Sequence, residues 1–306
     1  MKRVILAVLA VGLGVVLMRA AEHRPSNISV TAYEDAASDN CSDHFQLHKG
    51  EFATVVNGEE TRSLPNQPLD IRAEKNGGIH VTTWDQPEFS VKLCKQVAAN
   101  DESEGRKILN EIKLTVEGST VSVAVPQDGD HHNVATLVLV KAPKDAALKL
   151  KVKNGGASLN HFSGTAEAET TNGGISLRRS TGKLTVQAQN GGVSIKDCGG
   201  DISAKVANGG LSIALPERWE GKGLDAHTQN GGLAISVPKN FSSSLEVATS
   251  NYVKVVCRGD ICQNAQKTSE DGRQMFRLGS GDPQIRATTQ NGGVVIKDME
   301  RESAEK

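Results

Sequence analysis

The chain has 306 residues, and its 35 lysine and arginine residues nearly balance 36 acidic ones, so its formal net charge is −1. This balance argues against the basic field with which nucleic-acid-binding proteins attract phosphate groups. Aromatic residues make up only 3% while glycine occurs 31 times, a composition that favours many short strands joined by tight turns and disfavours a long aromatic sugar-binding groove.

Residues 1–20 are predicted to be a signal peptide. Lys2 and Arg3 precede an apolar run over residues 4–18, which fits the hydrophobic region of a signal and falls short of the roughly 20 residues of a spanning helix. The cleavage site is poor, because Met18 stands where a small residue is wanted, so an uncleaved N-terminal membrane anchor remains the alternative. No cysteine directly follows the run, so a lipoprotein is not expected. In either case we expect the body outside the cytoplasm: periplasmic, secreted or on the cell surface.

The cysteine content agrees with an oxidising compartment and leaves one thiol without a partner. The spacing of Cys257 and Cys262 allows a small local disulfide loop, and a pair between Cys41 and Cys94 is compatible with the sequence but not derivable from it. The odd cysteine has no assigned role. The five cysteines are Cys41, Cys94, Cys198, Cys257 and Cys262.

Three regions follow the leader. Residues 21–64 are predicted as a polar linker and a first strand, residues 65–143 as a β-rich region with one short helix, and residues 144–300 as β-solenoid repeats. The helix is expected near residues 101–110, with Asp101 or Ser103 as its N-cap. The expected strands of the middle region are 69–73, 77–85, 112–118, 120–127 and 134–143.

The repeat has a period of 18 residues, marked by an Asn-Gly-Gly corner. Aliphatic residues alternate at the same offsets in each unit, so that Leu184 corresponds to Ile202 and Ile175 to Val193. A fixed period with identical inward positions indicates stacked coils, because one coil cannot bury its own apolar face. A copy of the corner also stands at Asn76. The predicted structural corner residues of the array are Asn154, Gly155, Asn172, Gly173, Asn190, Gly191, Asn208, Gly209, Asn230, Gly231, Asn291 and Gly292.

Stacking predicts two details of these corners. Glycine is expected to supply a positive φ without steric cost, and successive asparagines are expected to hydrogen-bond as a ladder. The alternative is an antiparallel meander in which each Asn-Gly forms an ordinary type I′ hairpin turn. The favoured fold class is an all-β solenoid with coils of about 18 residues and an N-terminal β-rich cap carrying one short helix.

The array becomes irregular towards its end. Residues 216–223 are inserted into one corner, so Trp219 is expected to project from a loop. Residues 257–280 form an irregular excursion, after which residues 284–296 resume the pattern. Irregularity of this kind is typical of a cap on a solenoid.

Two segments resemble the bacterial putative-adhesin family of exported proteins, known as domain of unknown function 4097. They are "KNGGIHVTTWDQPEFSVKL" at residues 75–93 and "VLVKAPKDAALKLKVKNGGASL" at residues 138–159. The resemblance covers roughly residues 65–300 and implies a right-handed parallel β-helix, export, and no established catalytic activity. The chain departs from the family pattern in the cysteine-bearing excursion at residues 257–262.

The candidate reactive motifs point to binding more than to catalysis. Arg258, Gly259 and Asp260 stand between Cys257 and Cys262 and resemble constrained Arg-Gly-Asp loops that engage integrins, although so short a motif also arises by chance. The segment from Cys41 to His48 has ligand-like spacing but no second cluster to complete a metal site, so no metal is predicted. The histidines at 131 and 132 are interpreted as parts of a polar loop.

An enzyme is not predicted. The acidic residues of the repeats do not recur at stacked offsets, and no nucleophile-elbow, zinc-protease or phosphate-loop motif is present. These acidic residues are Glu167, Glu169, Asp197 and Asp201.

The sequence therefore favours a non-catalytic, exported, adhesin-like binding or scaffold module of the bacterial cell envelope, without a cofactor. Its expected partner is an unidentified protein or a cell-envelope glycan, not a nucleic acid, and it would touch a membrane only through an uncleaved N-terminal segment. One alternative is a polysaccharide-active β-helix enzyme with an acidic cleft beside residues 214–223 or 257–282. Another is a purely structural spacer.

Overall fold

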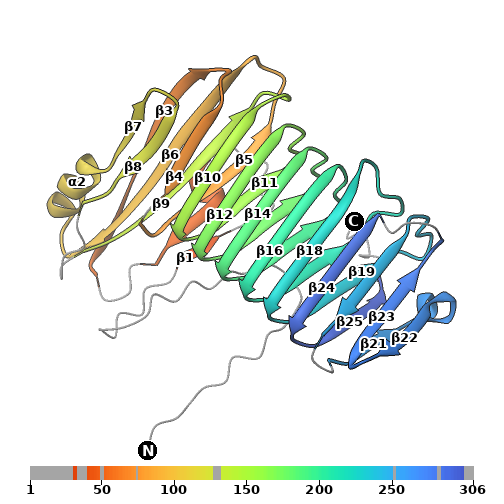
Figure 1. Cartoon of the computed structure of the whole chain (residues 1–306). Helices are drawn as coiled ribbons and strands as arrows, with labels where there is room; N and C mark the ends of the chain where they lie inside the picture. Colours follow the sequence, from red (N-terminus) through yellow and green to blue (C-terminus); the bar gives the residue numbers. More distant parts are fainter. Residues whose placement is uncertain are drawn as a thin grey trace, which may run out of the picture.

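The computed structural model describes residues 30–32, 40–48, 52–73, 75–126, 132–250, 253–280 and 284–299. The predicted signal peptide or anchor, residues 1–20, and His131 lie outside these residues. The described part is all-β and consists of two large mixed sheets that face each other, with the core between them (Figure 1). No helix in the described part is both long and apolar enough to cross a membrane.

The first sheet has 12 strands among the described residues. In spatial order they are β22 (Gln266–Glu270), β23 (Arg273–Leu278), β20 (Leu245–Thr249), β24 (Ile285–Asn291), β18 (Gly223–Asn230), β16 (Asp201–Asn208), β14 (Lys183–Asn190), β12 (Thr165–Asn172), β10 (Ala147–Asn154), β4 (Leu69–Ala73), β8 (Thr120–Ala124) and β7 (Lys113–Glu117).

The second sheet has 11 strands among the described residues. In spatial order they are β21 (Val255–Arg258), β25 (Val294–Asp298), β19 (Leu233–Val237), β17 (Leu211–Ala214), β15 (Val193–Lys196), β13 (Ile175–Arg178), β11 (Ala157–Asn160), β5 (Gly77–Thr83), β9 (His132–Ala142), β6 (Glu88–Ala99) and β3 (Thr54–Pro65). The remaining elements are β1 (Val30–Ala32), α1 (Cys41–His44), β2 (Phe45–Leu47), α2 (Glu102–Glu111) and the 3₁₀ helix η1 (Asp260–Asn264).

The chain alternates between the two sheets, and a coil here means one strand of the first sheet with the following strand of the second. Neighbouring coils from β10 to β19 pair in parallel, with Leu184 opposite Ile202 and Ile175 opposite Val193. The predicted 18-residue stacking register is therefore confirmed, and the antiparallel meander is wrong for these coils. Because side chains alternate along each strand, the aliphatic residues of every coil face the core and the polar ones face outward.

At both ends the spatial order of the coils differs from their order in the chain. The coil of β24 and β25, last in sequence, lies between the coil of β18 and β19 and that of β20 and β21. The antiparallel pair β22 and β23 continues the first sheet beyond β20. At the other end the coil of β8 and β9 lies outside the earlier coil of β4 and β5. The pattern predicts that coils stack in the order of the sequence, and at both ends of the molecule they do not.

The insertion at residues 216–223 folds inward. Trp219 is only 2% exposed, and its indole N–H donates to the carbonyl oxygen of Gly200 at 3.2 Å. Its backbone N–H donates to the hydroxyl of Ser243 at 2.8 Å. The prediction that Trp219 projects from a corner loop is wrong, because a large aromatic side chain gains more by filling the corner beside the core than by facing water.

The N-terminal region closes one end of the core. The predicted helix is α2, where the carboxylate of Asp101 accepts the N–H of Glu104 at 2.8 Å, so Asp101 and not Ser103 is the N-cap. Ile108 and Leu109 bury the inner face of this helix against the core. Two long antiparallel strands, β3 and β6, pair along their whole length, and β6 is not among the strands expected from the sequence.

Candidate binding sites

The predicted asparagine ladder runs along one edge of the molecule. Each side-chain amide donates to the carbonyl oxygen of the asparagine one coil below, at 2.9 Å from Asn172 to Asn154 and 3.0 Å from Asn291 to Asn230. The intervening links from Asn190, Asn208 and Asn230 measure 3.1, 3.1 and 3.0 Å. The ladder uses the amides to hold coils together, so its residues act in structure.

The corner glycines are required for a reason other than the predicted one. A Cβ atom built on the first glycine of a corner, such as Gly173 or Gly292, would overlap the backbone of the first glycine in the coil below. Only some of these glycines have a positive φ, for example Gly155 at 157°, close to the extended region. Close stacking of backbones, more than a left-handed conformation, therefore requires glycine at this position.

The Arg-Gly-Asp segment forms a closed turn at the end of the second sheet. A disulfide joins Cys257 to Cys262, and the carboxylate of Asp298 accepts the N–H groups of Asp260 at 2.8 Å and Ile261 at 3.2 Å. Gly259 has φ 105°, and a Cβ there would collide with that carboxylate. The disulfide and the two hydrogen bonds to Asp298 thus fix the backbone of the turn.

The charged side chains of this turn face solvent. Arg258 is exposed, while the carboxylate of Asp260 lies 3.9 Å from the ammonium group of Lys239, with both side chains more than 70% exposed. An ion pair at that distance and exposure is weak, so Asp260 remains accessible. The loop therefore presents a guanidinium and a carboxylate to solvent on a fixed backbone.

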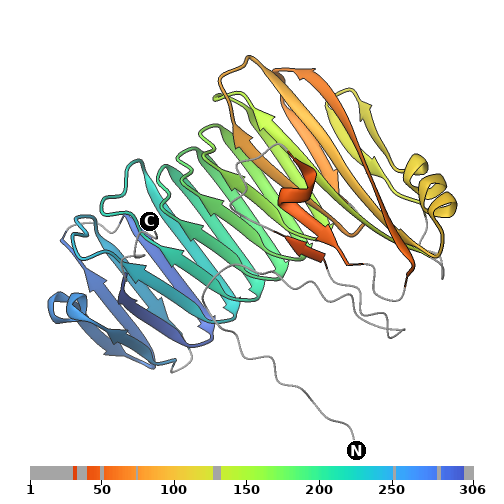
Figure 2. The same ribbon diagram turned by 180° about the vertical axis from the view of Figure 1, so that it is seen from behind.

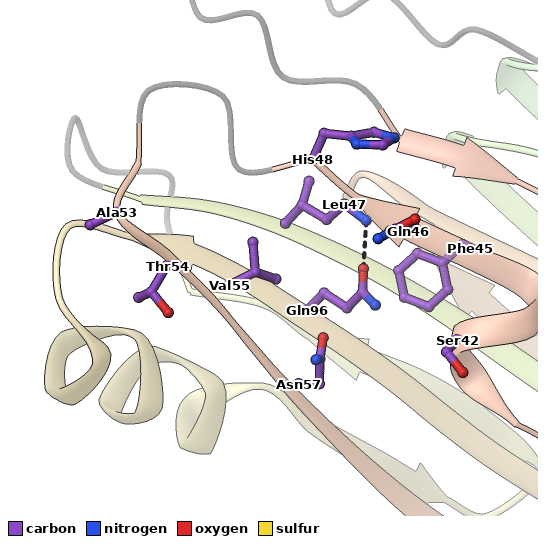
Figure 3. A pocket seen from close by; sticks show the side chains of 10 residues that line it. All are labelled: Ser42, Phe45, Gln46, Leu47, His48, Ala53, Thr54, Val55, Asn57 and Gln96. Carbon is purple, nitrogen blue, oxygen red and sulfur yellow. Dashed lines mark hydrogen bonds between the residues drawn. The ribbon is translucent and has the colours of Figure 1, made fainter.

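A pocket of about 600 Å³ lies at the opposite end, between β2 and the start of β3, with Gln96 of β6 between them (Figure 3). The N–H of Leu47 donates to the side-chain oxygen of Gln96 at 2.6 Å. Among the described lining residues, none carries a carboxylate, ammonium or guanidinium group. These residues are Ser42, Phe45, Gln46, Leu47, His48, Ala53, Thr54, Val55, Asn57 and Gln96. Amides, hydroxyls and the imidazole of His48 stand here beside apolar side chains, a lining that suits a small polar ligand.

The segment that forms one wall of this pocket is fastened to the outer face of the second sheet (Figure 2). A disulfide joins Cys41 to Cys94 of β6, a pairing that the sequence left open. Phe45 and Leu47 pack against outward-facing residues of β6 and β9 and form a small second core. Because this pocket combines side chains from residues 42–48 and 53–57 with Gln96, no local sequence motif pointed to it.

Two histidines meet beneath this segment. The imidazole rings of His44 and His80 have centroids 5.1 Å apart, and both side chains are buried. Burial, with a smaller contribution from the His44 charge, lowers the pKa of His80 to about 4. His80 is therefore neutral at physiological pH, and its role is to pack the segment against β5.

The described residues hold no group of three His, Cys, Asp or Glu side chains that could bind a metal ion. Cys41 is bonded to Cys94, and its predicted ligand-like neighbour His44 is buried against His80.

Glu167 forms an ion pair with Lys149 of the neighbouring strand at 3.1 Å. Cys198 is the free thiol, and burial raises its pKa to about 11, so it is not a reactive thiolate.

No family model matches the chain, and no curated protein matches it. Three solved structures illustrate the similarity found. They are a putative cell adhesion protein from Clostridium sporogenes (12% identity, 80% of this chain and 100% of that one, TM-score 0.29), a putative adhesin from Parabacteroides merdae (8%, 81% and 97%, TM-score 0.36) and a putative lipid binding protein from Parabacteroides distasonis (10%, 79% and 97%, TM-score 0.31). At these scores the likeness carries no conclusion about the function of this chain.

Proposed function

We propose that this chain is a non-catalytic, adhesin-like binding module of the bacterial cell envelope, built as a right-handed parallel β-helix. The observation that carries the proposal is the unbroken parallel pairing of coils, which places outward side chains in straight rows on two broad faces. Such rows are rigid, because each strand is held on both sides by its neighbours and along one edge by the asparagine ladder. A preorganised surface binds with a smaller ordering cost than a flexible one.

Export and an envelope location form part of this proposal. Two disulfides suit an oxidising compartment, and the apolar run at residues 4–18 suits a signal peptide or an anchor. The proposed contact regions are the loop of Arg258, Gly259 and Asp260 and the pocket beside β2. The partner is an envelope protein or glycan.

The test uses the protein as it is recovered after export and measures whether it retains material from envelope fractions. We expect immobilised protein to retain a defined wall or membrane component, and N-terminal sequencing to start beyond residue 20 if the leader is removed. Comparing retention by the oxidised protein with retention by the same protein after reduction shows whether the Cys257–Cys262 disulfide loop takes part in binding. Retention of nothing from any envelope fraction would leave the spacer alternative, whereas depolymerisation of an anionic glycan would replace the proposal with the enzyme alternative.

A further inference from the structure

The outer face of the second sheet carries two straight rows of side chains that run along the stack of coils. Strand alternation and the parallel register place one outward residue of each coil in each row, about 4.8 Å from the next. The serine row is Ser158, Ser176, Ser194, Ser212, Ala234, Val295 and Val256. The basic row is Asn160, Arg178, Lys196, Ala214, Ser236, Lys297 and Arg258.

These two rows contain no aspartate or glutamate, which distinguishes this face from the other. On the first sheet, some acidic and basic residues face each other on neighbouring strands, as in the pairs of Lys149 with Glu167 and Arg277 with Glu246. Opposite charges on neighbouring strands offset one another there. On the second sheet the cations of the basic row have no such neighbours within the rows.

Arg258 and Lys297 are the clearest case. They are directly opposite each other on β21 and β25, both are exposed, and neither has a carboxylate partner within the described part of the chain. Like charges in this position repel each other, so the pairing lowers stability unless an anion lies between them. Arg178 and Lys196, further along the row, already make polar contacts, so an incoming anion would first meet Lys297 and Arg258.

Two acidic groups lie nearby, and neither is paired with Lys297 or Arg258. Asp298 accepts two backbone N–H groups of the disulfide-closed turn, and Asp260 faces Lys239 at 3.9 Å. Ser236 adjoins Lys297 on the other side and offers a hydroxyl to the same ligand. The three side chains form a strip of one hydroxyl and two cations over three adjacent strands.

We propose that this face binds a linear anionic glycan lying along the stack, with Lys297 and Arg258 holding one of its acidic groups. Ser194 and Ser212 of the serine row contact its hydroxyls, since the hydroxyl oxygens of Ser158 and Ser176 are buried. The inference rests on the proposed binding function and names its ligand class. Charge complementarity selects an anion, and the small side chains of the serine row let a chain lie close to the sheet. Both rows lack aromatic side chains, so stacking on a base or a sugar ring would play no part.

The experiment measures binding of full-length protein to immobilised heparin as the linear anionic probe, with dextran as the neutral one. We expect R258Q/K297Q to weaken heparin binding about tenfold, since two charge-assisted contacts are lost, and wild-type binding to weaken as salt increases. The matched control is K151Q/K205Q, which removes the same charge from outward positions of the first sheet and should change binding less than about twofold. The four side chains point outward, so neither double variant should unfold at a lower temperature than the wild type, and R258Q/K297Q, which removes a pair of like charges, should unfold at the same or a slightly higher temperature.

Absence of heparin binding by the wild type, or equal losses in both double variants, overturns the proposed site. Tighter binding to vesicles of phosphatidylcholine with phosphatidylglycerol than to heparin overturns the glycan assignment in favour of a lipid headgroup. Retention of envelope material by R258Q/K297Q at the wild-type level leaves the binding function standing and rejects this ligand. If the wild type binds heparin but retains no envelope material, the anion-binding site stands and the proposed envelope-binding function is rejected.

Discussion

At the scale of single residues, the two glycines of each corner are not equivalent, although the sequence repeats both. A Cβ on Gly292 would overlap the carbonyl oxygen of Gly231 in the adjacent coil, whereas nothing lies within 4 Å of a Cβ on Gly293. We therefore expect Gly292→Ala to lower the free energy of unfolding by at least about 2 kcal/mol, because the coils must move apart or the corner must distort. Gly293→Ala should stay within about 0.5 kcal/mol of the wild type.

Urea denaturation of the two variants, followed by circular dichroism, measures this difference. The pair is matched because both changes add one methyl group to neighbouring positions of a single corner. Equal destabilisation would mean that backbone freedom, not stacking distance, explains the glycines.

At the scale of elements, the docking of the α1–β2 segment on the second sheet should depend on pH through His80. The pKa of His80 is about 4 in the folded chain and about 6.5 in an unfolded one. Between these values the unfolded state binds more protons, so the stability contributed by the neutral ring is fully present above pH 6.5 and is lost as pH falls towards 4. The largest loss is about 3 kcal/mol, the equivalent of 2.5 pKa units.

The corresponding measurement compares wild type with His80→Asn across this pH range. The variant should be less stable at pH 7, because it loses packing against His44, but its stability should fall less between pH 6.5 and 4. Carboxylate titration affects both proteins alike and cancels in the difference. If the free energies of unfolding of the two proteins changed with pH in parallel over the whole range, His80 would not be the source of the pH dependence.

Elements with a periodic pattern could be predicted from the sequence, and elements whose place depends on distant contacts could not. The strands of the coils from β10 to β19 follow from the 18-residue repeat, because the same inward positions recur and one register satisfies them all. In contrast, β6 alternates polar and apolar residues only from Glu88 to Leu93, and beyond that point both of its faces are buried, so the alternation does not continue along the strand. Its inner residues join the main core, while Cys94 and Ala98 on its outer face are covered by the α1–β2 segment.

The candidate sites were predictable only in part. The disulfide-closed turn at Arg258 was visible because its residues are adjacent in sequence. The pocket beside β2 and the pairing of Arg258 with Lys297 join residues 39 or more positions apart, and only the strand order brings them together. Trp219 could not be placed either, since an insertion of eight residues can fold inward or outward with the same sequence pattern.

At the scale of the whole molecule, the last coil in the chain is an interior layer. β24 and β25 pair with β18 and β19 on one side and with β20 and β21 on the other. Their inward residues Ile285, Val294 and Ile296 are at most 1% exposed. Residues 245–278 therefore rest on a layer that the chain supplies only afterwards.

Removal of residues 284–306 should consequently release more than the deleted strands. The apolar rows above and below would lose their common partner, so we expect amides of residues 245–278 to lose protection in hydrogen exchange measured by mass spectrometry. The coils from β10 to β17 should stay protected, because stacked repeats depend mainly on their nearest neighbours. The control, removal of residues 300–306, leaves β25 in place and should leave the exchange of residues 245–278 unchanged. If residues 245–278 kept their protection in the longer truncation, they would have to stack directly on β18 and β19, which the observed order of strands does not allow without a new register.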